Sequence, residues 1–194
     1  MTLQILRARD REAQPWKNGG GVTREIAVHP PRADFDSFDW RVSTAVVDAS
    51  GPFSRFDGVD RTLLLLEGPA LRLLIDGSIS TTLRTASAPV SFPADVPVEA
   101  TLPHGRVIDL NVMVRRGRWS EQIERVDFAG DTQIRCQADA SLVMSLDACT
   151  LASAAAEEPI EPGDVVQLHP GETADLRSGA DSCRLVVIEL SRLV

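Results

Sequence analysis

Short apolar segments separated by turn residues are the feature that most limits how this 194-residue chain can fold. Each segment is five to nine residues long, is rich in Val, Leu, Ile and Thr, and is followed closely by Gly, Pro, Asp or Ser. Such segments, with turn signals between them, are typical of all-β sandwiches and barrels. They are VTREIAV, WRVSTAVV, RTLLLLE, LRLLI, RVIDLNVMV, SLVMSL, DVVQLH and CRLVVIEL.

Helical periodicity is scarce, and the chain divides near its middle. Two stretches, SEQIERV (120–126) and TLASAAAEE (150–158), favour a turn of helix each. A change in composition near 115–122 separates a longer first half, 1–118, from a shorter second half, 119–194. No low-complexity linker joins the halves, so we expect them to pack as one compact unit.

Charge and composition exclude several classes of protein. The net charge of -8 and a pI near 4.9 argue against a nucleic-acid partner, because such binders need a positive surface. No apolar run reaches the roughly 18 residues of a membrane helix, and the first 14 residues carry charges, which favours a cytoplasmic protein without a membrane partner. The three cysteines lack CxxC spacing and are expected to be buried, small apolar residues.

Three consecutive glycines interrupt the segment PWKNGGGVTREIAVHP, residues 15–30. Glycine loses more backbone freedom on folding than any other residue, so the run needs a structural or functional reason. It matches neither GxGxxG nor GxxxxGK[ST], and a strand follows it, which disfavours a phosphate-binding loop. A tight turn or bulge that leads the chain into a sheet is the simpler interpretation.

Two of the expected strands place an arginine among apolar residues on one face. Strict alternation groups Arg24 with Val22, Ile26 and Val28, and groups Arg61 with Leu63, Leu65 and Glu67.

An arginine that faces a barrel interior keeps its charge at any ordinary pH. It therefore needs a carboxylate partner, a water-filled cavity or an anionic ligand. Glu25, Glu67 and Asp109 are candidate internal partners for Arg24 and Arg61. The residues alone leave open whether these arginines form structural ion pairs or line a ligand-binding pocket.

Several longer strings carry a resemblance to a known family. PWKNGGGVTREIAVHP, WRVSTAVVDASGPFSRFDGVDR, LLLLEG, VSFPADVPVEATL and DLNVMVRR resemble, in order and spacing, the HutD/Ves family of bicupin proteins. The match is close over about 14–118. It implies an all-β bicupin fold, with two cupin-like β-barrel or jelly-roll halves in one chain. It further implies a non-catalytic, regulatory role in histidine utilisation through binding of urocanate or N-formylglutamate.

The resemblance also points to individual residues. Matching positions of its three motifs are Trp16, Lys17, Asn18, Arg24 and Glu25, then Phe53, Ser54, Phe56 and Arg61, then Asn111 and Met113. Two departures, Leu110 where phenylalanine is expected and FPAD in place of FxGD, would alter the shape of a pocket.

We expect a small carboxylate ligand, because arginine pairs with carboxylates through short, charge-assisted hydrogen bonds. Cationic side chains would contact the carboxylate, two aromatic rings would wall the pocket, and an amide would orient the ligand. The predicted ligand-binding residues are Trp16, Lys17, Asn18, Arg24, Glu25, Phe56 and Arg61.

No metal, other cofactor or catalytic residue is expected. The three histidines, His29, His104 and His169, form no HxH pair. The segment EPGDVVQLHPGETADL (161–176) looks like a second cupin motif, but Ala174 stands where its metal-binding histidine would be expected. No serine or cysteine has a recognisable spacing to a histidine.

Two other functions remain as alternatives. The first is a metal-independent enzyme acting on a similar acid, with Glu25 or Glu67 as general base. The second is a structural or interaction protein whose arginines are fully paired internally. Edge strands of open cupin sheets also favour a homodimer.

Overall fold

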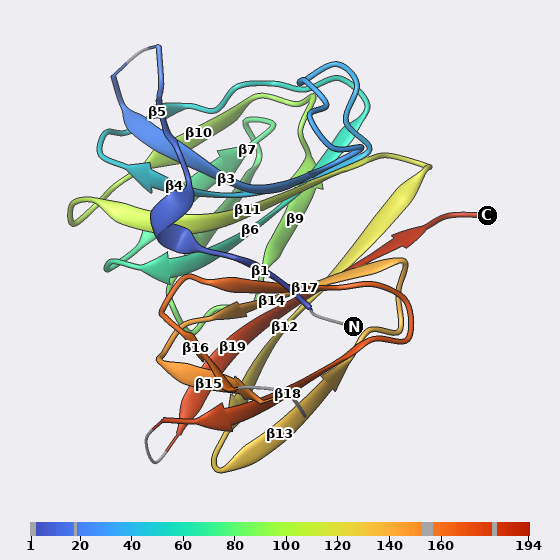
Figure 1. The fold of residues 1–194 in the computed structure, drawn as a ribbon. Coiled ribbons are helices and arrows are strands. Elements are labelled where there is room, and N and C mark those ends of the chain that lie inside the picture. Colours follow the sequence, from blue (N-terminus) through green and yellow to red (C-terminus); the bar gives the residue numbers. More distant parts are fainter. Residues whose placement is uncertain (1–2, 18, 153–156, 180–181) are drawn as a thin grey trace. The chain divides into compact units, whose positions relative to one another are not determined.

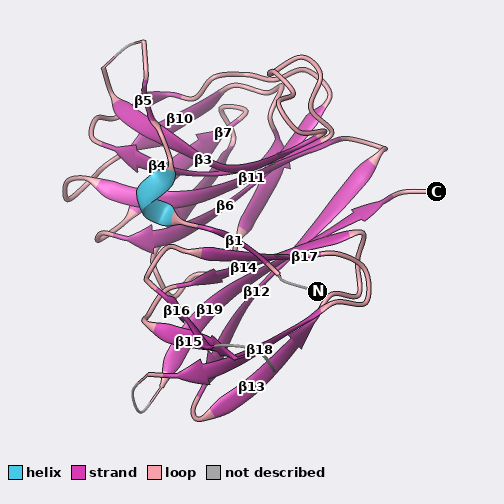
Figure 2. Cartoon of the chain, viewed as in Figure 1, coloured by secondary structure: helices cyan, strands magenta, loops and turns pink. Residues whose placement is uncertain are grey.

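The computed structural model describes residues 3–17, 19–152, 157–179 and 182–194. These residues form an all-β structure in which one short 3-10 helix, η1 (Ala8–Asp10), is the helical element (Figure 1, Figure 2). The chain divides into two compact units: one is Glu12–Trp119, and the other combines Met1–Arg11 with Ser120–Val194. Within the described residues, no helix has the length and apolar character needed to cross a membrane.

The Glu12–Trp119 unit consists of two antiparallel sheets, one of six strands and one of four. In spatial order, the larger sheet contains β2 (Ala13–Pro15), β3 (Gly21–His29), β4 (Trp40–Val47), β11 (Val107–Arg115), β6 (Val59–Glu67) and β9 (Val90–Pro93). The smaller sheet contains β5 (Gly51–Pro52), β10 (Val98–Thr101), β7 (Leu71–Ile75) and β8 (Ile79–Leu83). Its hydrophobic core takes side chains from both sheets, such as Leu65 of β6 and Leu73 of β7, both fully buried.

The other unit repeats this plan with different strands. Its larger sheet contains β1 (Gln4–Leu6), β17 (Val165–Leu168), β14 (Ala140–Ser145), β19 (Cys183–Arg192) and β12 (Trp119–Phe128). Its smaller sheet contains β13 (Asp131–Arg135), β18 (Thr173–Ser178), β15 (Cys149–Ala152) and β16 (Glu157–Ile160). Cys136, Cys149 and Cys183 are free thiols buried in this core, which confirms the prediction that they behave as small apolar residues.

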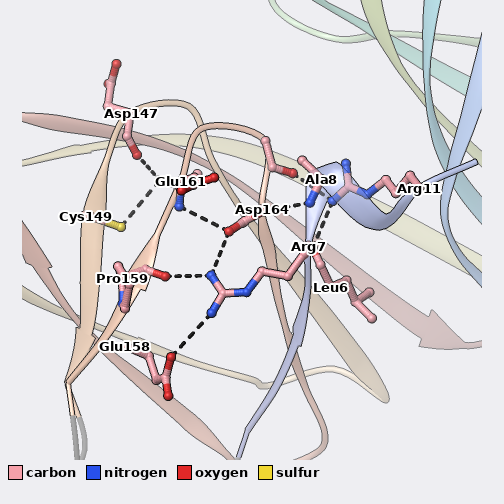
Figure 3. A network of polar contacts seen from close by, with 12 residues as sticks. Leu6, Arg7, Ala8, Arg11, Asp147, Cys149, Glu158, Pro159, Glu161 and Asp164 are labelled. Atoms are coloured by element: carbon pink, nitrogen blue, oxygen red, sulfur yellow. Dashed lines mark hydrogen bonds and ion pairs between the residues drawn. The ribbon is translucent and has the colours of Figure 1, made fainter.

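Residues 3–11 complete this second unit rather than the one that follows them in sequence. Strand β1 pairs antiparallel with β17, so that Ile5 lies opposite Val166 (Figure 1). Asp164 then fixes the segment: it accepts hydrogen bonds from the Ala8 N–H at 2.7 Å and from Arg7 at 2.8 Å (Figure 3). The division predicted at 118/119 places this segment in the first half, since backbone pairing between distant strands leaves no local signal in the sequence.

The pKa of Asp164 reflects this network. Burial pushes the pKa of this carboxyl upward, but hydrogen bonds from the Ala8 and Glu161 backbone and from Arg7 outweigh it and hold the pKa below its ordinary value. The carboxylate is therefore charged in the folded protein, and its ion pair with Arg7 is largely buried. It joins the amino-terminal segment to the loop before β17.

Neither expected helical turn is present in the described residues. The stretch 120–126 lies within β12, at the edge of the five-stranded sheet. The stretch 150–158 belongs to β15 up to Ala152 and to β16 from Glu157, and 153–156 lie outside the described residues. The helix prediction for 120–126 was wrong, because pairing with neighbouring strands overrides a weak local propensity. The centre of the other predicted turn lies outside the described residues.

Candidate functional site

A cavity of about 860 Å³ opens in the Glu12–Trp119 unit. One face of the six-stranded sheet forms its floor, and the segments 14–17, 35–36 and 52–57 form its walls. It adjoins the hydrophobic core, since Leu63 belongs to both, while Trp16 and Phe53 pack against the core and line the cavity. Its volume lies within the range of about 300–1,000 Å³ that is typical of small-molecule sites.

Strand register decides which side chains reach this cavity. Arg61 of β6 lies opposite Met113 of β11, and Met113 lies opposite Arg41 of β4. Two and four residues before Met113, Asn111 and Asp109 point to the same side, because side chains alternate along a strand. The floor is therefore lined with charged and polar groups where a sheet interior ordinarily carries apolar ones.

Arg61 is the most unusual of these residues. It is 5% exposed, and its guanidinium lies 5.4 Å from the Phe53 ring centroid and 5.3 Å from that of Phe56. Its Nη2 donates a weak hydrogen bond to the Met113 sulfur at 3.8 Å, and Nε has no partner among the described residues. Burial lowers the pKa of Arg61 to about 10, with Asp109 opposing and Arg41 adding to this effect. The group is therefore a buried cation at neutral pH.

Arg41, by contrast, is neutralised within the protein. Its Nε donates a hydrogen bond to Glu25 Oε2 at 2.7 Å, and the two form a salt bridge. The guanidinium lies 4.7 Å from the ring centroid of Phe35. An arginine that is paired in this way is less available to an anion than Arg61.

A carboxyl group and an amide group, those of Asp109 and Asn111, lie on the same cavity floor. Asp109 is 2% exposed, and burial raises its pKa to about 7, although the charge of Arg61 and a hydrogen bond with the Ala45 backbone lower it. Its Oδ1 has no hydrogen-bond partner in the described part of the chain, and the same holds for Asn111 Oδ1. Arg61 and Asp109 form no direct ion pair, so each keeps bonding capacity toward the cavity.

The glycine run shapes one wall of the cavity. Gly19 adopts a positive φ of 71° in the turn between β2 and β3. This agrees with the prediction that the glycine run forms a tight turn leading into the sheet. At Gly21 a Cβ would overlap the Val46 carbonyl oxygen and lie 3.1 Å from the indole of Trp16. The indole Nε1 donates a hydrogen bond to Thr23 Oγ1 at 2.7 Å. Glycine thus lets the Trp16 ring lie against the strand at the cavity wall.

The structure places the seven predicted residues in different environments. Trp16, Lys17, Phe56 and Arg61 line the cavity. Glu25 does not line it and instead binds Arg41. Asn18 lies outside the described residues.

The expectation that Arg24 faces the cavity was wrong. Thr23 lies opposite Ala45, and both line the cavity, so Arg24 lies on the other face of the sheet. A bulge between Glu25 and Ala27 then shifts the register of β3. The residues before and after the bulge therefore do not follow one alternation, because a bulge inserts one unpaired residue into the strand.

Sequence reasoning overlooked Arg41 and did not place Asp109 among the predicted ligand-binding residues. The alternation argument used for Arg61 could have placed Arg41 on the same face as Ala45, within WRVSTAVV. Neither carboxylate proposed as a general base lies on the cavity lining, since Glu67 is exposed and Glu25 is ion-paired.

The histidines lie apart from the cavity lining. His29 stacks on Trp40, with ring centroids 5.6 Å apart, and lies 5.4 Å from Trp119. His169 is exposed, and its backbone N–H donates to Glu172. Among the described residues, no group of three or more His, Cys, Asp or Glu side chains is arranged to hold a metal ion.

Solved structures with the same fold extend over nearly the whole chain. A conserved protein of unknown function from Pseudomonas aeruginosa PAO1 has a TM-score of 0.86 at 30% identity, covering 98% of this chain and all of that one. HutD from Pseudomonas fluorescens SBW25, in a formate condition, has a TM-score of 0.81 at 28% identity, with both chains fully covered. A cupin 2 conserved barrel domain protein from Leptotrichia buccalis, at 9% identity and a TM-score of 0.63, shares the fold alone.

Curated relatives match a shorter stretch. An uncharacterised 21.2 kDa protein in the hutC 3′ region of Pseudomonas putida is 38% identical over 125 residues, which are 64% of this chain and 65% of that protein. Protein Ves of Cronobacter sakazakii is 40% identical over 113 residues, 58% of this chain and 60% of its own length. The chain thus spans less than two thirds of these relatives. The HutD family model matches residues 8–186, and the chain belongs to the HutD family.

Proposed function

We propose that this protein binds a small organic acid in the cavity of the Glu12–Trp119 unit and acts without catalysing a reaction. Arg61 is the group that holds the carboxylate. The observation that carries the proposal is a buried cation on a cavity floor whose Nε has no partner among the described residues. A ligand carboxylate would satisfy both its charge and its hydrogen-bonding capacity.

The walls of the cavity suit the rest of such a ligand. Phe53 and Phe56 lie near the Arg61 guanidinium, and Trp16 lines the same cavity. Aromatic rings offer apolar area to an unsaturated or methylene chain while polar groups fix its orientation. Lys17, exposed at the wall, adds positive charge that attracts anions.

The family supports a choice of acid. Since this chain belongs to the HutD family, and a relative is described by its place beside hutC in P. putida, acids of histidine utilisation are the leading candidates. Urocanate and N-formylglutamate each combine a carboxylate with a second polar group. Formate serves as the smallest carboxylate probe.

The test is calorimetric titration of the intact protein with urocanate, N-formylglutamate, glutamate and formate. We expect at least one of these acids to bind, and we expect Arg61→Ala to weaken that binding about 30-fold or more, because a buried charge partner contributes about 2 kcal/mol or more. Arg24→Ala is the matched control, since Arg24 lies on the opposite face of the same sheet. It should leave the affinity within about twofold.

Two results would count against this function. The first is absence of binding of all four acids by a protein that is shown to be folded by circular dichroism. The second is equal loss of affinity in Arg24→Ala and Arg61→Ala, which would indicate a general effect of charge rather than a contact in the cavity.

A further inference from the structure

Asp109 is the one carboxyl group on the described cavity floor that is almost completely buried. It is 2% exposed and lines the cavity between Leu65 of β6 and Ala45 of β4, its register neighbours. Its Oδ1 has no hydrogen-bond partner among the described residues. A buried acceptor without a partner costs free energy, so Oδ1 would gain from a hydrogen bond with a group that enters the cavity.

The protonation state of Asp109 depends on Arg61. Burial raises the pKa of Asp109 to about 7, while the positive charge of Arg61 lowers it. An anion that binds Arg61 would offset this positive charge and bring a negative charge close to the carboxyl. Both changes favour the neutral acid, because a nearby like charge disfavours ionisation.

Other charged groups around the cavity are either paired or lie on its walls. Arg41 on β4 is bound by Glu25 of β3. Arg115, on the same strand as Asp109, donates hydrogen bonds to backbone carbonyls, including that of Asp57. The remaining charged groups that line the cavity are Lys17, Asp36, Arg55 and the Asp57 side chain, all of them exposed.

We propose that Asp109 is a second recognition group of the cavity, which donates its carboxylic O–H to a ligand held by Arg61. The ligand class is then a small acid that carries a further hydrogen-bond acceptor besides its bound carboxylate. When this acid binds to a protein in which Asp109 is ionised, the Asp109 carboxylate takes up one proton from solvent. The inference rests on the proposed function and adds a pH dependence to it.

The geometry explains why a neutral acid suits this position. Arg61 and Asp109 lie on neighbouring strands but form no ion pair, so the ligand can bridge a cation and a hydrogen-bond donor. A charged carboxylate at Asp109 would repel an anion bound to Arg61, and the burial of both side chains strengthens that repulsion. A neutral one donates a hydrogen bond and removes that repulsion.

Calorimetric titration of the whole protein with N-formylglutamate tests this, because its carboxylates stay ionised between about pH 6 and 9. In buffers with different ionisation enthalpies we expect uptake of up to one proton per ligand near pH 8. We also expect the affinity to fall as the pH rises above about 7, approaching tenfold per pH unit. Urocanate, measured in the same way, replaces N-formylglutamate if it is the acid that binds.

Asp109→Asn is the matched variant, since the amide keeps the shape and a donor but does not titrate. It should bind without proton uptake and with an affinity that does not change with pH. Glu67→Gln is the control, because Glu67 is exposed and lies opposite Ile108, the residue before Asp109, in the strand register. This variant should keep the proton uptake and the pH dependence of the unaltered protein.

The outcomes separate this inference from the proposed function. If binding depends on Arg61 but the unaltered protein takes up no proton, the role of Asp109 is overturned and the proposed function stands. Proton uptake that persists in Asp109→Asn overturns it as well. If none of the acids binds at any pH, the proposed function fails, and this inference fails with it.

Discussion

In the Glu12–Trp119 unit, the inward face of the central strands carries Arg61 and Asp109, whereas in the other unit it carries Val143 of β14 and Val187 of β19. Both units are built from two antiparallel sheets. In one, charged groups surround a cavity of about 860 Å³, and in the other, valine belongs to a continuous apolar core. In a shared architecture, a few inward side chains therefore decide whether a unit has a cavity lined with charges or an apolar core.

The difference has an energetic consequence. An apolar core gains free energy from every buried methylene, roughly 0.8 kcal/mol each. A buried arginine costs free energy unless it is paired, and Arg61 has no carboxylate ion-pair partner among the described residues. The Glu12–Trp119 unit therefore gives up stability at the proposed binding site, which is common where function needs a preorganised charge.

The largest effect is expected when a charge is placed in the apolar unit. Val143→Asp would bury a carboxyl beside Val166 and Val187, where the described core offers no cation. We expect the free energy of unfolding to fall by about 4 kcal/mol or more, in urea denaturation at neutral pH. Val143→Ala, which removes volume without adding charge, should cost about 2 kcal/mol. Equal losses in the two variants would show that this interior tolerates charge.

A smaller loss of stability should follow removal of Asp164, the buried carboxylate that anchors the amino-terminal segment. Asp164→Ala removes the acceptor of the Ala8 N–H and the buried carboxylate partner of Arg7, which keeps the Pro159 carbonyl and the more exposed Glu158. We therefore expect unfolding to become about 3 kcal/mol easier. Because hydrogen bonding holds the pKa of Asp164 below its ordinary value, this stabilisation is complete above about pH 4 and is lost as the pH falls through the lower folded pKa.

Denaturation of both proteins at about pH 7 and pH 3 checks this. The difference in free energy of unfolding between the unaltered protein and Asp164→Ala should shrink at the lower pH. Glu158→Gln, which alters the more exposed partner of Arg7, is the control and should change stability by less than about 1 kcal/mol. A difference of the same size at both pH values would contradict the assigned role of the charge.

Substitution of the third glycine should be next in size. Gly21→Ala introduces a Cβ that overlaps the Val46 carbonyl and presses on the Trp16 ring. We expect a loss of about 2 kcal/mol, seen as a lower Tm, together with weaker ligand binding through displacement of the cavity wall. Gly51→Ala is the control, because no described atom beyond its two chain neighbours lies within 4 Å of a Cβ at that position. A Gly21→Ala protein with unchanged Tm would show that the contact is not tight.

The smallest effect is a gain. Burial lowers the pKa of Arg61 to about 10, so the folded state disfavours its charge at every pH below about 10, and this cost fades as the pH rises from there toward the unfolded pKa. We expect Arg61→Met to raise the free energy of unfolding by about 1–2 kcal/mol at neutral pH, since part of the cost is offset by the nearby Phe53 and Phe56 rings. Arg24→Met should change it by less than about 0.5 kcal/mol. A clear loss of stability in Arg61→Met would indicate that Arg61 is a structural residue.

Much of the fold could be predicted from the sequence, because each strand carries its own apolar pattern and turn signals. All eight apolar segments overlap strands of the structure, from β3 to β19. The pairing of β1 with β17 could not be predicted, since it joins residues more than 150 positions apart and β1 has only three residues. The stretch 120–126 was misassigned because its strand character comes from neighbours that local sequence does not show.

The site could be predicted only in part. The position of Arg61 followed from alternation on β6, which is regular there, and from the resemblance to the family. Arg24 was misplaced because the bulge in β3 is not visible in its pattern of residue types. The importance of Asp109 depends on its burial and on its separation from Arg61, and both are properties of three-dimensional packing.

The most direct test of the central claim is a crystal structure of the protein with N-formylglutamate or urocanate. It should show a ligand carboxylate within about 3 Å of the Arg61 guanidinium, beside the Phe53 and Phe56 rings, in the cavity of the Glu12–Trp119 unit. An acid bound elsewhere, or an Arg61 side chain paired with Asp109 in a site that excludes the acid, would contradict the claim.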